Sequence, residues 1–183
     1  MSAPPQVRRR DRVMSDSDTL AALQAGYCGR LATIGTDGYP YCVPLLYVVI
    51  DGEVYVHNTS ARGHLRMNVD HDARVCFETD EAGAVFPYGR FECDSTLAYK
   101  SVVVFGTVRV IDDRATKQRF CEALMEKYAK PEWTRPKGMF PRIDLITVYA
   151  IAPARMTGKE IALPEVAEQW PAVDRTKSPN API

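Results

Sequence analysis

Residues 36–64 read TDGYPYCVPLLYVVIDGEVYVHNTSARGH, with Asp-Gly pairs at 37–38 and 51–52 between apolar, β-branched runs. Asp-Gly favours a tight hairpin because Asp tolerates a positive φ and Gly adopts it freely. The pattern predicts a β-meander, with strands at 30–36, 41–50 and 53–58. The third strand leads directly into the polar loop 57–64.

The two later strands of this meander differ in their patterns. In 53–58, Val54 and Val56 share one face, as in a strand buried on one side. The stretch 42–50 is almost continuously apolar, which is typical of a strand covered on both faces. Pro44 lacks an N–H to donate there, so a bulge or an unpaired edge is expected. This irregularity can open a sheet to a planar ligand, but blunting of a sheet edge is the simpler interpretation.

Helices and further strands are expected around the meander. A capping box at 15–18 predicts a short helix that ends at Gly26, and Asp112 or Asp113 caps a helix through Tyr128. The other expected elements are a helix at 65–70, strands at 74–79, 99–111 and 143–152 (the last extending toward 157), and loops at 80–98 and 130–142. A loop as long as 80–98 often carries function. In the helix that ends at Tyr128, Phe120 and Leu124 recur with helical spacing and are assigned to the core. In the strand at 99–111, Gly106 marks a bulge or a close backbone approach. The strand-rich pattern predicts a mainly β fold, a small barrel with peripheral helices.

Composition limits the class of protein. The chain has 183 residues, 46% hydrophobic and 25% charged, which fits one globular domain. We divide it into a flexible N-terminal segment (1–14), a folded domain (15–160) and a Pro-rich tail (161–183). The 23 basic residues balance 23 acidic ones, so neither nucleic acid nor a membrane is expected as a partner. Without an apolar span of ~20 residues or a secretion signal, a cytoplasmic location is expected.

Several catalytic and metal-binding classes find no support in the sequence. The 5 cysteines are dispersed without a Cys-x-x-Cys pair and are expected to be free thiols. His57, His64 and His71 recur every seven residues, but no Cys or carboxylate stands beside them at ligand spacing, so no metal site is expected. Nucleophile-elbow, Walker and dinucleotide-binding motifs are absent.

The polar loop 57–64 has the residue types of a phosphate site. Arg62 offers a fork of donors, Gly63 allows close approach of the backbone, and a helix is expected to begin beside them. The competing interpretation is that Arg62 and Arg66 are solvated cations at a helix end.

Several segments together resemble a known family. They are 29–34 (GRLATI), 37–41 (DGYPY), 43–45 (VPL), His57 with 62–64 (RGH), 73–77 (ARVCF) and 99–106 (YKSVVVFG). In this order they resemble the FMN-binding split-barrel proteins related to pyridoxamine 5′-phosphate oxidase, above all the nitroimidazole-reductase-like (Nim) branch. The resemblance extends over residues 8–158 and implies a split β-barrel homodimer that holds one FMN at each of two clefts between subunits.

The resemblance also implies a set of cofactor-binding residues. Next to the isoalloxazine it places Ala32 and Thr33, with the backbone of Val43, Pro44 and Leu45 at the polar edge of the ring. It places His57, Asn58 and Ser60 on the ribityl-phosphate side of the cofactor. Arg62, Gly63 and His64 would hold the phosphate. Tyr99, Ser101 and Val102 would approach from the strand expected at 99–111. Relatives commonly carry Lys where His64 stands. Because histidine is mostly uncharged at pH 7, phosphate binding here is expected to be weaker and more pH-dependent.

The function that the resemblance implies is an FMN-dependent oxidoreductase that reduces a small organic acceptor, as a nitroreductase does. No side chain is assigned to catalysis, since the flavin carries the electrons; Tyr99 or His57 would position substrate. Two alternatives stay open on the same fold: a reductase that uses the deazaflavin coenzyme, and a non-enzymatic protein that binds flavin or haem.

Overall fold

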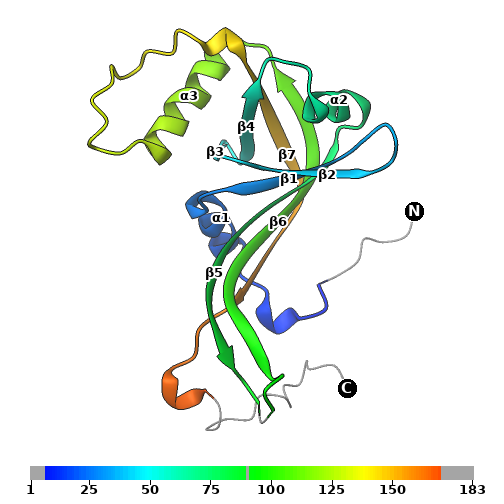
Figure 1. Ribbon diagram of the computed structural model, residues 1–183, viewed down its shortest axis with the longest axis vertical. Coiled ribbons are helices and arrows are strands. Elements are labelled where there is room, and N and C mark those ends of the chain that lie inside the picture. Colours follow the sequence, from blue (N-terminus) through cyan, green and yellow to red (C-terminus); the bar gives the residue numbers. More distant parts are fainter. Residues whose placement is uncertain (1–6, 90, 170–183) are drawn as a thin grey trace. The chain divides into compact units, whose positions relative to one another are not determined.

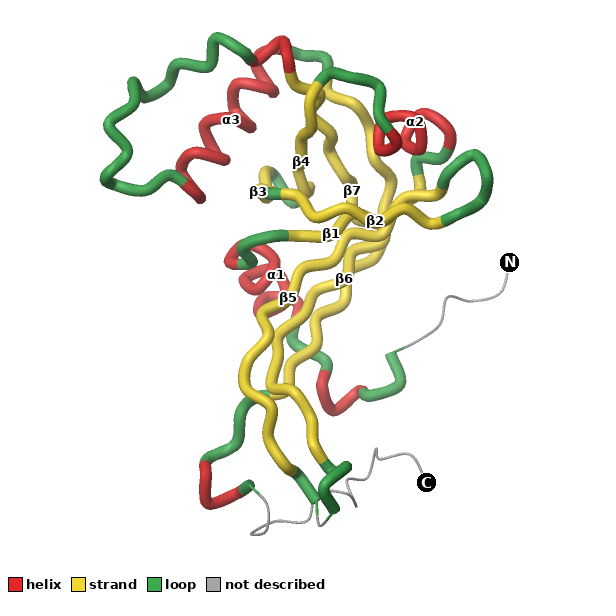
Figure 2. Tube along the Cα trace, viewed as in Figure 1, coloured by secondary structure: helices red, strands yellow, loops and turns green. Residues whose placement is uncertain are grey.

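The computed structural model describes residues 7–89 and 91–169, which form a seven-stranded sheet with three α-helices (Figures 1 and 2). The strands are β1 (Gly29–Ile34), β2 (Pro40–Leu45), β3 (Tyr47–Ile50), β4 (Glu53–Thr59), β5 (Arg74–Pro87), β6 (Ser95–Ile111) and β7 (Ile146–Ile161). The helices are α1 (Asp16–Ala25), α2 (His64–His71) and α3 (Arg114–Tyr128), and short 3-10 turns occur at Arg10–Arg12, Ile143–Leu145 and Val166–Glu168.

The strand order makes this sheet a split barrel. It runs β2-β1-β5-β6-β7-β4-β3, so β2 and β3 are its two ends. In the chain the same two strands are separated by Leu46 alone. The two end strands of the sheet are therefore neighbours in the sequence, but no hydrogen-bonded ladder joins them. This confirms the predicted mainly β fold with a split barrel.

The chain divides into two compact units. The larger comprises Leu23–Thr79 and Val103–Met156, and the smaller comprises the described residues of Met1–Ala22, Asp80–Val102 and Thr157–Ile183. Strands β5, β6 and β7 each contribute residues to both units. Within the smaller unit, the chain before α1 pairs with the end of β7 through the bridge between Val13 and Lys159.

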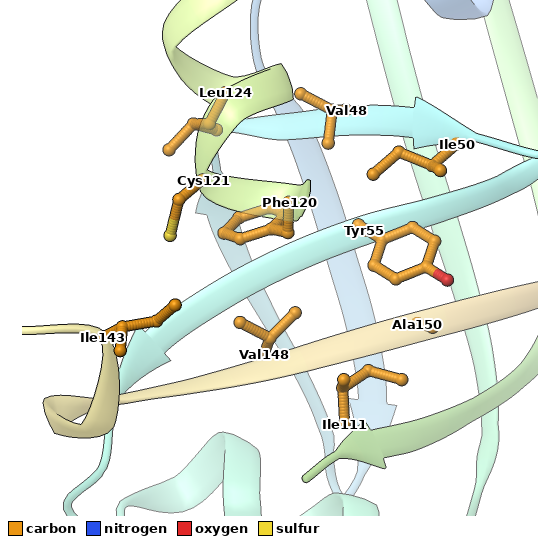
Figure 3. Close-up of a cluster of buried hydrophobic side chains, with 10 residues drawn as sticks. All are labelled: Val48, Ile50, Tyr55, Ile111, Phe120, Cys121, Leu124, Ile143, Val148 and Ala150. Carbon is orange, nitrogen blue, oxygen red and sulfur yellow. The ribbon is translucent and has the colours of Figure 1, made fainter. Parts of the chain in front are cut away.

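The core of the larger unit has two sides. On one side, Tyr47, Val54 and Val56 are fully buried, and the Tyr47 ring lies edge-on to Phe77, with ring centres 4.9 Å apart. On the other side, α3 places Phe120 and its neighbours on β3, β4 and β7 (Figure 3). This cluster comprises Val48, Ile50, Tyr55, Ile111, Phe120, Cys121, Leu124, Ile143, Val148 and Ala150. The assignment of Phe120 and Leu124 to the core is confirmed.

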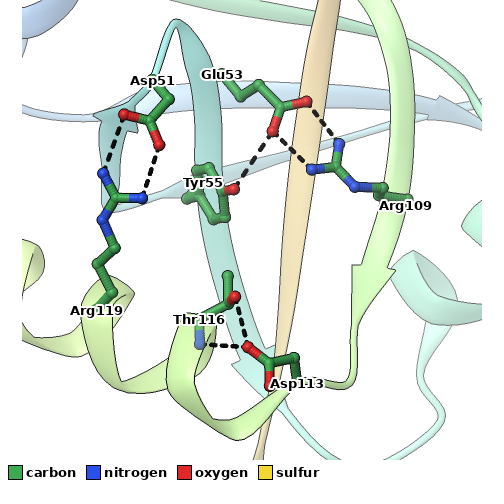
Figure 4. Close-up of polar contacts among 7 residues, drawn as sticks. All are labelled: Asp51, Glu53, Tyr55, Arg109, Asp113, Thr116 and Arg119. Carbon is green, nitrogen blue, oxygen red and sulfur yellow. Dashed lines mark hydrogen bonds and ion pairs between the residues drawn. The ribbon is translucent and has the colours of Figure 1, made fainter.

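One of the two predicted Asp-Gly turns and the predicted helix cap form as expected. At Asp37-Gly38 only the glycine has a positive φ, and the turn between β1 and β2 spans residues 35–39. Asp51 and Gly52 both have positive φ, 52° and 82°, as the tight hairpin between β3 and β4 requires. The side chain of Asp113 caps α3 by accepting hydrogen bonds from the backbone N–H and the hydroxyl of Thr116, both at 2.7 Å (Figure 4). Arg119 of α3 also pairs with Asp51 at 2.6 Å, which fastens the helix to the hairpin. The local sequence therefore sets both the turn and the helix that packs beside it.

Gly106 fits the expected close backbone approach. A Cβ atom there would lie 2.2 Å from the carbonyl oxygen of Ala152. A side chain at this position would push β6 away from β7, and the glycine keeps the two strands in contact. β7 itself continues through Pro153 and ends at Ile161, further than the expected limit at 157.

The prediction of one strand over 41–50 is wrong in two respects. The strand divides at Leu46 into β2 and β3, which take opposite ends of the sheet. Residues of β2 alternate between exposed and half-buried, so this part is not covered on both faces. Pro44 lies opposite Arg30 on a strand that ends the sheet, in agreement with the simpler interpretation of a blunted edge.

The predicted loop at 80–98 is also wrong. β5 extends to Pro87 and β6 begins at Ser95, so only the short connection 88–94 lies outside the strands. Gly83 lies within β5. A Cβ atom at this position would lie 3.0 Å from the carbonyl oxygen of Ala98, which explains why a glycine stands here. The glycine marks close strand contact and not a loop. Of the predicted terminal segments, residues 1–6 and 170–183 lie outside the described residues.

Lys127 is an unusual buried group at the end of α3. Its Nζ is buried without a hydrogen-bond partner, 3.9 Å from the ring centre of Tyr47 and 5.3 Å from that of Tyr128. Burial lowers the pKa of the Lys127 ammonium to about 8 from the ordinary 10.5. The folded state therefore disfavours the charged form, and attraction to the two rings offsets only part of that cost.

We expect Lys127→Met to raise the free energy of unfolding by about 1 kcal/mol at pH 7, because an uncompensated polar group leaves the interior. The pKa is lower in the folded state than in the unfolded one, so wild-type stability should increase as pH rises from about 8 toward 10.5. Urea denaturation across this pH range measures both effects, and the variant should lack the rise. Equal pH dependence in the two proteins would contradict the assignment.

Candidate functional site

The polar loop predicted to hold phosphate leads from the end of β4 into α2. The Ser60 N–H donates to the carbonyl oxygen of Leu145 at 3.0 Å, which fixes the loop beside the chain that enters β7. Gly63 is the N-cap residue of α2 and forms no side-chain capping hydrogen bond. The first N–H groups of α2 are thus free of a capping side chain, and they carry the positive end of the helix dipole.

Two arginines of this loop and helix share one carboxylate. Arg62 pairs with Oδ2 of Asp70 at 2.6 Å, and Arg66 pairs with Oδ1 at 2.9 Å. The Arg62 side chain is 67% exposed, so its guanidinium stays accessible from solvent. His64 lies at the start of the same helix, with its ring 5.4 Å from that of Tyr41 in an edge-on contact. Arg62, Gly63 and His64 are therefore brought together at one helix terminus. Asp70 was not predicted, because its role depends on the turns of α2.

His57 and Asn58 face opposite sides of β4, as consecutive strand residues do. The His57 ring lies 5.3 Å from the Phe120 ring beneath α3, and its Nδ1 is buried without a hydrogen-bond partner. Burial lowers the pKa of His57, so its imidazole is neutral at pH 7. Asn58 instead accepts a hydrogen bond from the hydroxyl of the buried Tyr149 at 3.1 Å. The structure does not bring these two predicted site residues to one surface.

A buried hydrogen bond attaches α2 to β1. The amide of Asn68 donates to the Thr33 hydroxyl at 3.0 Å, and both residues are almost fully buried. The Thr33 hydroxyl in turn lies 3.4 Å from the carbonyl oxygen of Tyr41 on β2. The Thr33 side chain thus holds three elements together. Asn68 was not singled out from the sequence, although it stands between the buried Leu65 and Val69 on one helical face.

The outward face of β2, β1 and β5 forms an apolar row, which we call the sheet-face row: Cys42, Ala32 and Cys76, with Phe105 of β6. Cys42 pairs with Ala32, and Ala32 pairs with Cys76, so their side chains emerge on the same face. Phe105 is 39% exposed, as is expected of an outward residue on β6. The neighbouring Pro44 is exposed, whereas Val43 and Leu45 are half-buried and point to the opposite face. The row is apolar and partly open to solvent, with Cys42 exposed and Ala32 and Cys76 half-buried.

The remaining predicted residues lie on β6 in the smaller unit. Tyr99 and Ser101 are half-buried, and Val102 is 1% exposed, pointing to the other face of the strand. All five cysteines, Cys28, Cys42, Cys76, Cys93 and Cys121, are free, as expected.

Within residues 7–89 and 91–169, no group of three or more His, Cys, Asp or Glu side chains could hold a metal ion. In the same part of the chain, no helix combines the length and apolar character that a transmembrane span requires.

Comparison with known proteins gives a consistent result. The sequence profile described as pyridoxamine 5′-phosphate oxidase matches residues 15–160. No curated protein sequence matches the chain. Among solved structures, a flavocytochrome from Azotobacter vinelandii is 20% identical with a TM-score of 0.72, over 89% of this chain and 77% of that one. A protein from Bacteroides thetaiotaomicron assigned to 5-nitroimidazole antibiotic resistance is 19% identical with a TM-score of 0.66, over 80% and 85%. An FAD-binding protein from Mesorhizobium loti is 25% identical with a TM-score of 0.61, over 82% and 98%.

Proposed function

Because the chain belongs to the pyridoxamine 5′-phosphate oxidase family, we propose that it is an FMN-dependent oxidoreductase that reduces a small organic acceptor. The observation that carries the proposal is the combination of two surfaces in one compact unit. A cationic helix terminus at Arg62–His64 suits a phosphate, and the sheet-face row suits a flat, apolar ring. FMN contains both of these chemical groups.

The residues at the start of α2 fit a phosphate group. Arg62 and Arg66 provide two guanidinium groups, Gly63 leaves room for close approach, and the helix start supplies N–H donors. Asp70 holds both arginines and would be their competing anion. A phosphate dianion carries more charge than one carboxylate, so it should draw Arg62 away from Asp70. His64 at the first helical position would add a donor.

The sheet-face row is proposed to hold the ring. Ala32 has a small side chain between Cys42 and Cys76, and the backbone of Val43, Pro44 and Leu45 on the edge strand would contact the polar edge of the ring. The buried Thr33 hydroxyl would act indirectly, by holding β1 and β2 against α2. Ser60 would face the ribityl-phosphate side. His57 and Asn58 would support this loop from the two faces of β4. Tyr99, Ser101 and Val102 lie in the smaller unit, and their contact with the flavin stays an expectation from the family resemblance.

When bound, FMN would supply the electron transfer between a donor and the acceptor molecule. The chain's own residues would bind and orient it and exclude water from the ring. The neutral imidazole of His57 fits this role, since burial beside Phe120 keeps a charge away from the site. The reduction of nitro compounds is proposed because the nitroimidazole-resistance protein from Bacteroides thetaiotaomicron shares the fold.

We also propose that two copies of the chain form a homodimer with the flavins between them. The sheet-face row is apolar and open to solvent in the single chain, and Ile34 and Phe105 on this face are 38% and 39% exposed. A second copy would cover these side chains and the ring. One rotational symmetry axis then creates two equivalent flavin clefts.

The absorption spectrum of the purified protein tests the cofactor. Oxidised flavin absorbs near ~450 nm, whereas a haem gives a Soret band and the deazaflavin coenzyme adds its own fluorescence, since each chromophore keeps its own chemistry. A non-enzymatic flavin or haem carrier is the second candidate, because an FAD- and haem-binding protein from Mycobacterium smegmatis shares the fold. Turnover of a nitroaromatic compound by flavin-loaded protein would favour the enzyme.

We expect Arg62→Ala to weaken FMN binding by about 1.5–3 kcal/mol, roughly 10- to 150-fold, because a charge-assisted phosphate contact is lost. Riboflavin lacks the phosphate, so its affinity should change little. Fluorescence titration of both flavins measures the difference.

Two further variants separate this effect from a loss of structure. Arg114→Ala removes an exposed arginine that pairs with Asp144 and should leave both affinities unchanged. Asp70→Asn removes the competing carboxylate and should tighten FMN binding without affecting riboflavin. Equal losses for FMN and riboflavin in Arg62→Ala would remove Arg62 from the phosphate site.

A further inference from the structure

Within residues 7–89 and 91–169, Arg155 on β7 forms no ion pair with a carboxylate. Its guanidinium carbon lies 4.3 Å from the centre of the Phe105 ring, and its side chain is half-buried. The other arginines on the described strands all form ion pairs: Arg30 with Glu78, Arg74 with Asp72 and Arg109 with Glu53. Arg155 alone among these strand arginines keeps its fork of donors unpaired in the described structure.

The unpaired guanidinium stands at the border of the sheet-face row. Phe105, beneath it, is a member of that row. The charge of Arg155 also acts on the Cys76 thiol, whose pKa is raised mainly by burial and lowered slightly by the arginine. Cys76 pairs directly with Ala32, where the ring is proposed to lie. Glu78, an acidic residue on this face, is already engaged by Arg30 at 2.9 Å.

A guanidinium in this position needs an anionic partner once the face is covered. Stacking on one phenylalanine ring is worth only about 0.5–1 kcal/mol at an exposed site. Removing the unpaired charge from water costs more than that, unless donors on the arginine find an acceptor. The acceptor must come from what binds to the face.

We propose that Arg155 directs its positive charge at the electron-rich edge of the bound flavin and thereby raises the flavin's reduction potential. This inference rests on the proposed function. Adding two electrons and one proton to the neutral ring leaves it with one extra negative charge. A nearby guanidinium stabilises that charge and has little effect on the neutral, oxidised ring. Arg155 is therefore a residue that binds reduced flavin more tightly than oxidised flavin.

The experiment compares Arg155→Met, Arg155→Lys and Arg109→Met in flavin-loaded protein. The reduction potential of the bound flavin is measured by titration with dithionite against a reference dye, and affinities for oxidised and reduced FMN are measured separately. We expect Arg155→Met to lower the affinity ratio of reduced to oxidised FMN about tenfold, which is about 30 mV for a two-electron couple. Arg155→Lys should keep most of the potential, and Arg109→Met, which breaks a pair with Glu53, should leave it unchanged.

The possible outcomes separate this inference from the proposed function. If wild-type protein binds no flavin, both are overturned. If wild-type protein binds FMN and Arg155→Met binds both redox forms with the wild-type ratio, only the role of Arg155 is overturned. Should Arg155→Met fail to fold, Arg155→Gln keeps a polar side chain without the charge and must show the same lowered potential. A potential that falls equally in Arg109→Met would also overturn the inference, because the effect would then come from net charge.

Discussion

Phe120→Ala should lower the free energy of unfolding by about 3–5 kcal/mol, since it empties a fully buried site in the cluster beneath α3. The ring packs against side chains of β3, β4 and β7 and lies 5.3 Å from the His57 ring (Figure 3). A cavity there cannot be refilled easily, because the strands are fixed by their ladders and α3 is fixed by Asp113 and Arg119 (Figure 4). Equilibrium denaturation in urea measures the loss.

A second readout links this cavity to the candidate site. Burial against Phe120 lowers the pKa of His57, so solvent entering the cavity should return that pKa toward its ordinary value of 6.5. Histidine titration by NMR follows this shift. Met125→Ala, on the same helix but 39% exposed, is the matched control and should cost less than about 1 kcal/mol. If Phe120→Ala lowered the free energy of unfolding by as little as Met125→Ala, the packing of α3 against the sheet would not contribute to stability as proposed.

The parts of the fold that could be predicted are those set by local chemistry. The hairpin at Asp51-Gly52 and the helix capped by Asp113 follow from residues a few positions apart, and both form as expected. The division at Leu46 could not be read from the sequence, since β2 and β3 are equally apolar and part only because they join opposite ends of the sheet. The extended β5–β6 hairpin was missed because Gly83 signals a loop locally, whereas here it permits strand contact.

The candidate site was predictable to a similar extent. Arg62, Gly63 and His64 are neighbours in sequence, and they lie together at the start of α2. The other contacts of the candidate site join elements that are far apart in the sequence, so no local sequence pattern predicts them. Asn68 reaches Thr33 across 35 positions, and Arg155 meets Phe105 through the pairing of β6 with β7 in the sheet. Such contacts depend on sheet order, which the chain's topology decides.

We expect Ala32→Lys to weaken the binding of FMN and of riboflavin alike, by roughly 100-fold or more, and to abolish dimer formation. The long side chain would occupy the place proposed for the ring, and an unpaired charge covered by a second copy costs about 3–5 kcal/mol. The change should leave the single chain folded, because Ala32 is only half-buried and faces outward between Cys42 and Cys76. Arg62→Ala should spare riboflavin, so the two variants distinguish the ring site from the phosphate site.

Sedimentation and flavin titration on the same samples test this expectation. Wild-type protein should sediment with a mass near twice 20.5 kDa, and dilution that separates the subunits should release flavin in parallel. Ala32→Lys should sediment as a folded monomer, with circular dichroism like that of wild type. Ala129→Lys, an exposed position at the end of α3, is the control and should keep both the dimer and the flavin. A wild-type monomer that retains FMN at full occupancy would exclude a site between subunits, and an Ala32→Lys dimer with undiminished flavin affinity would move the ring off the sheet-face row.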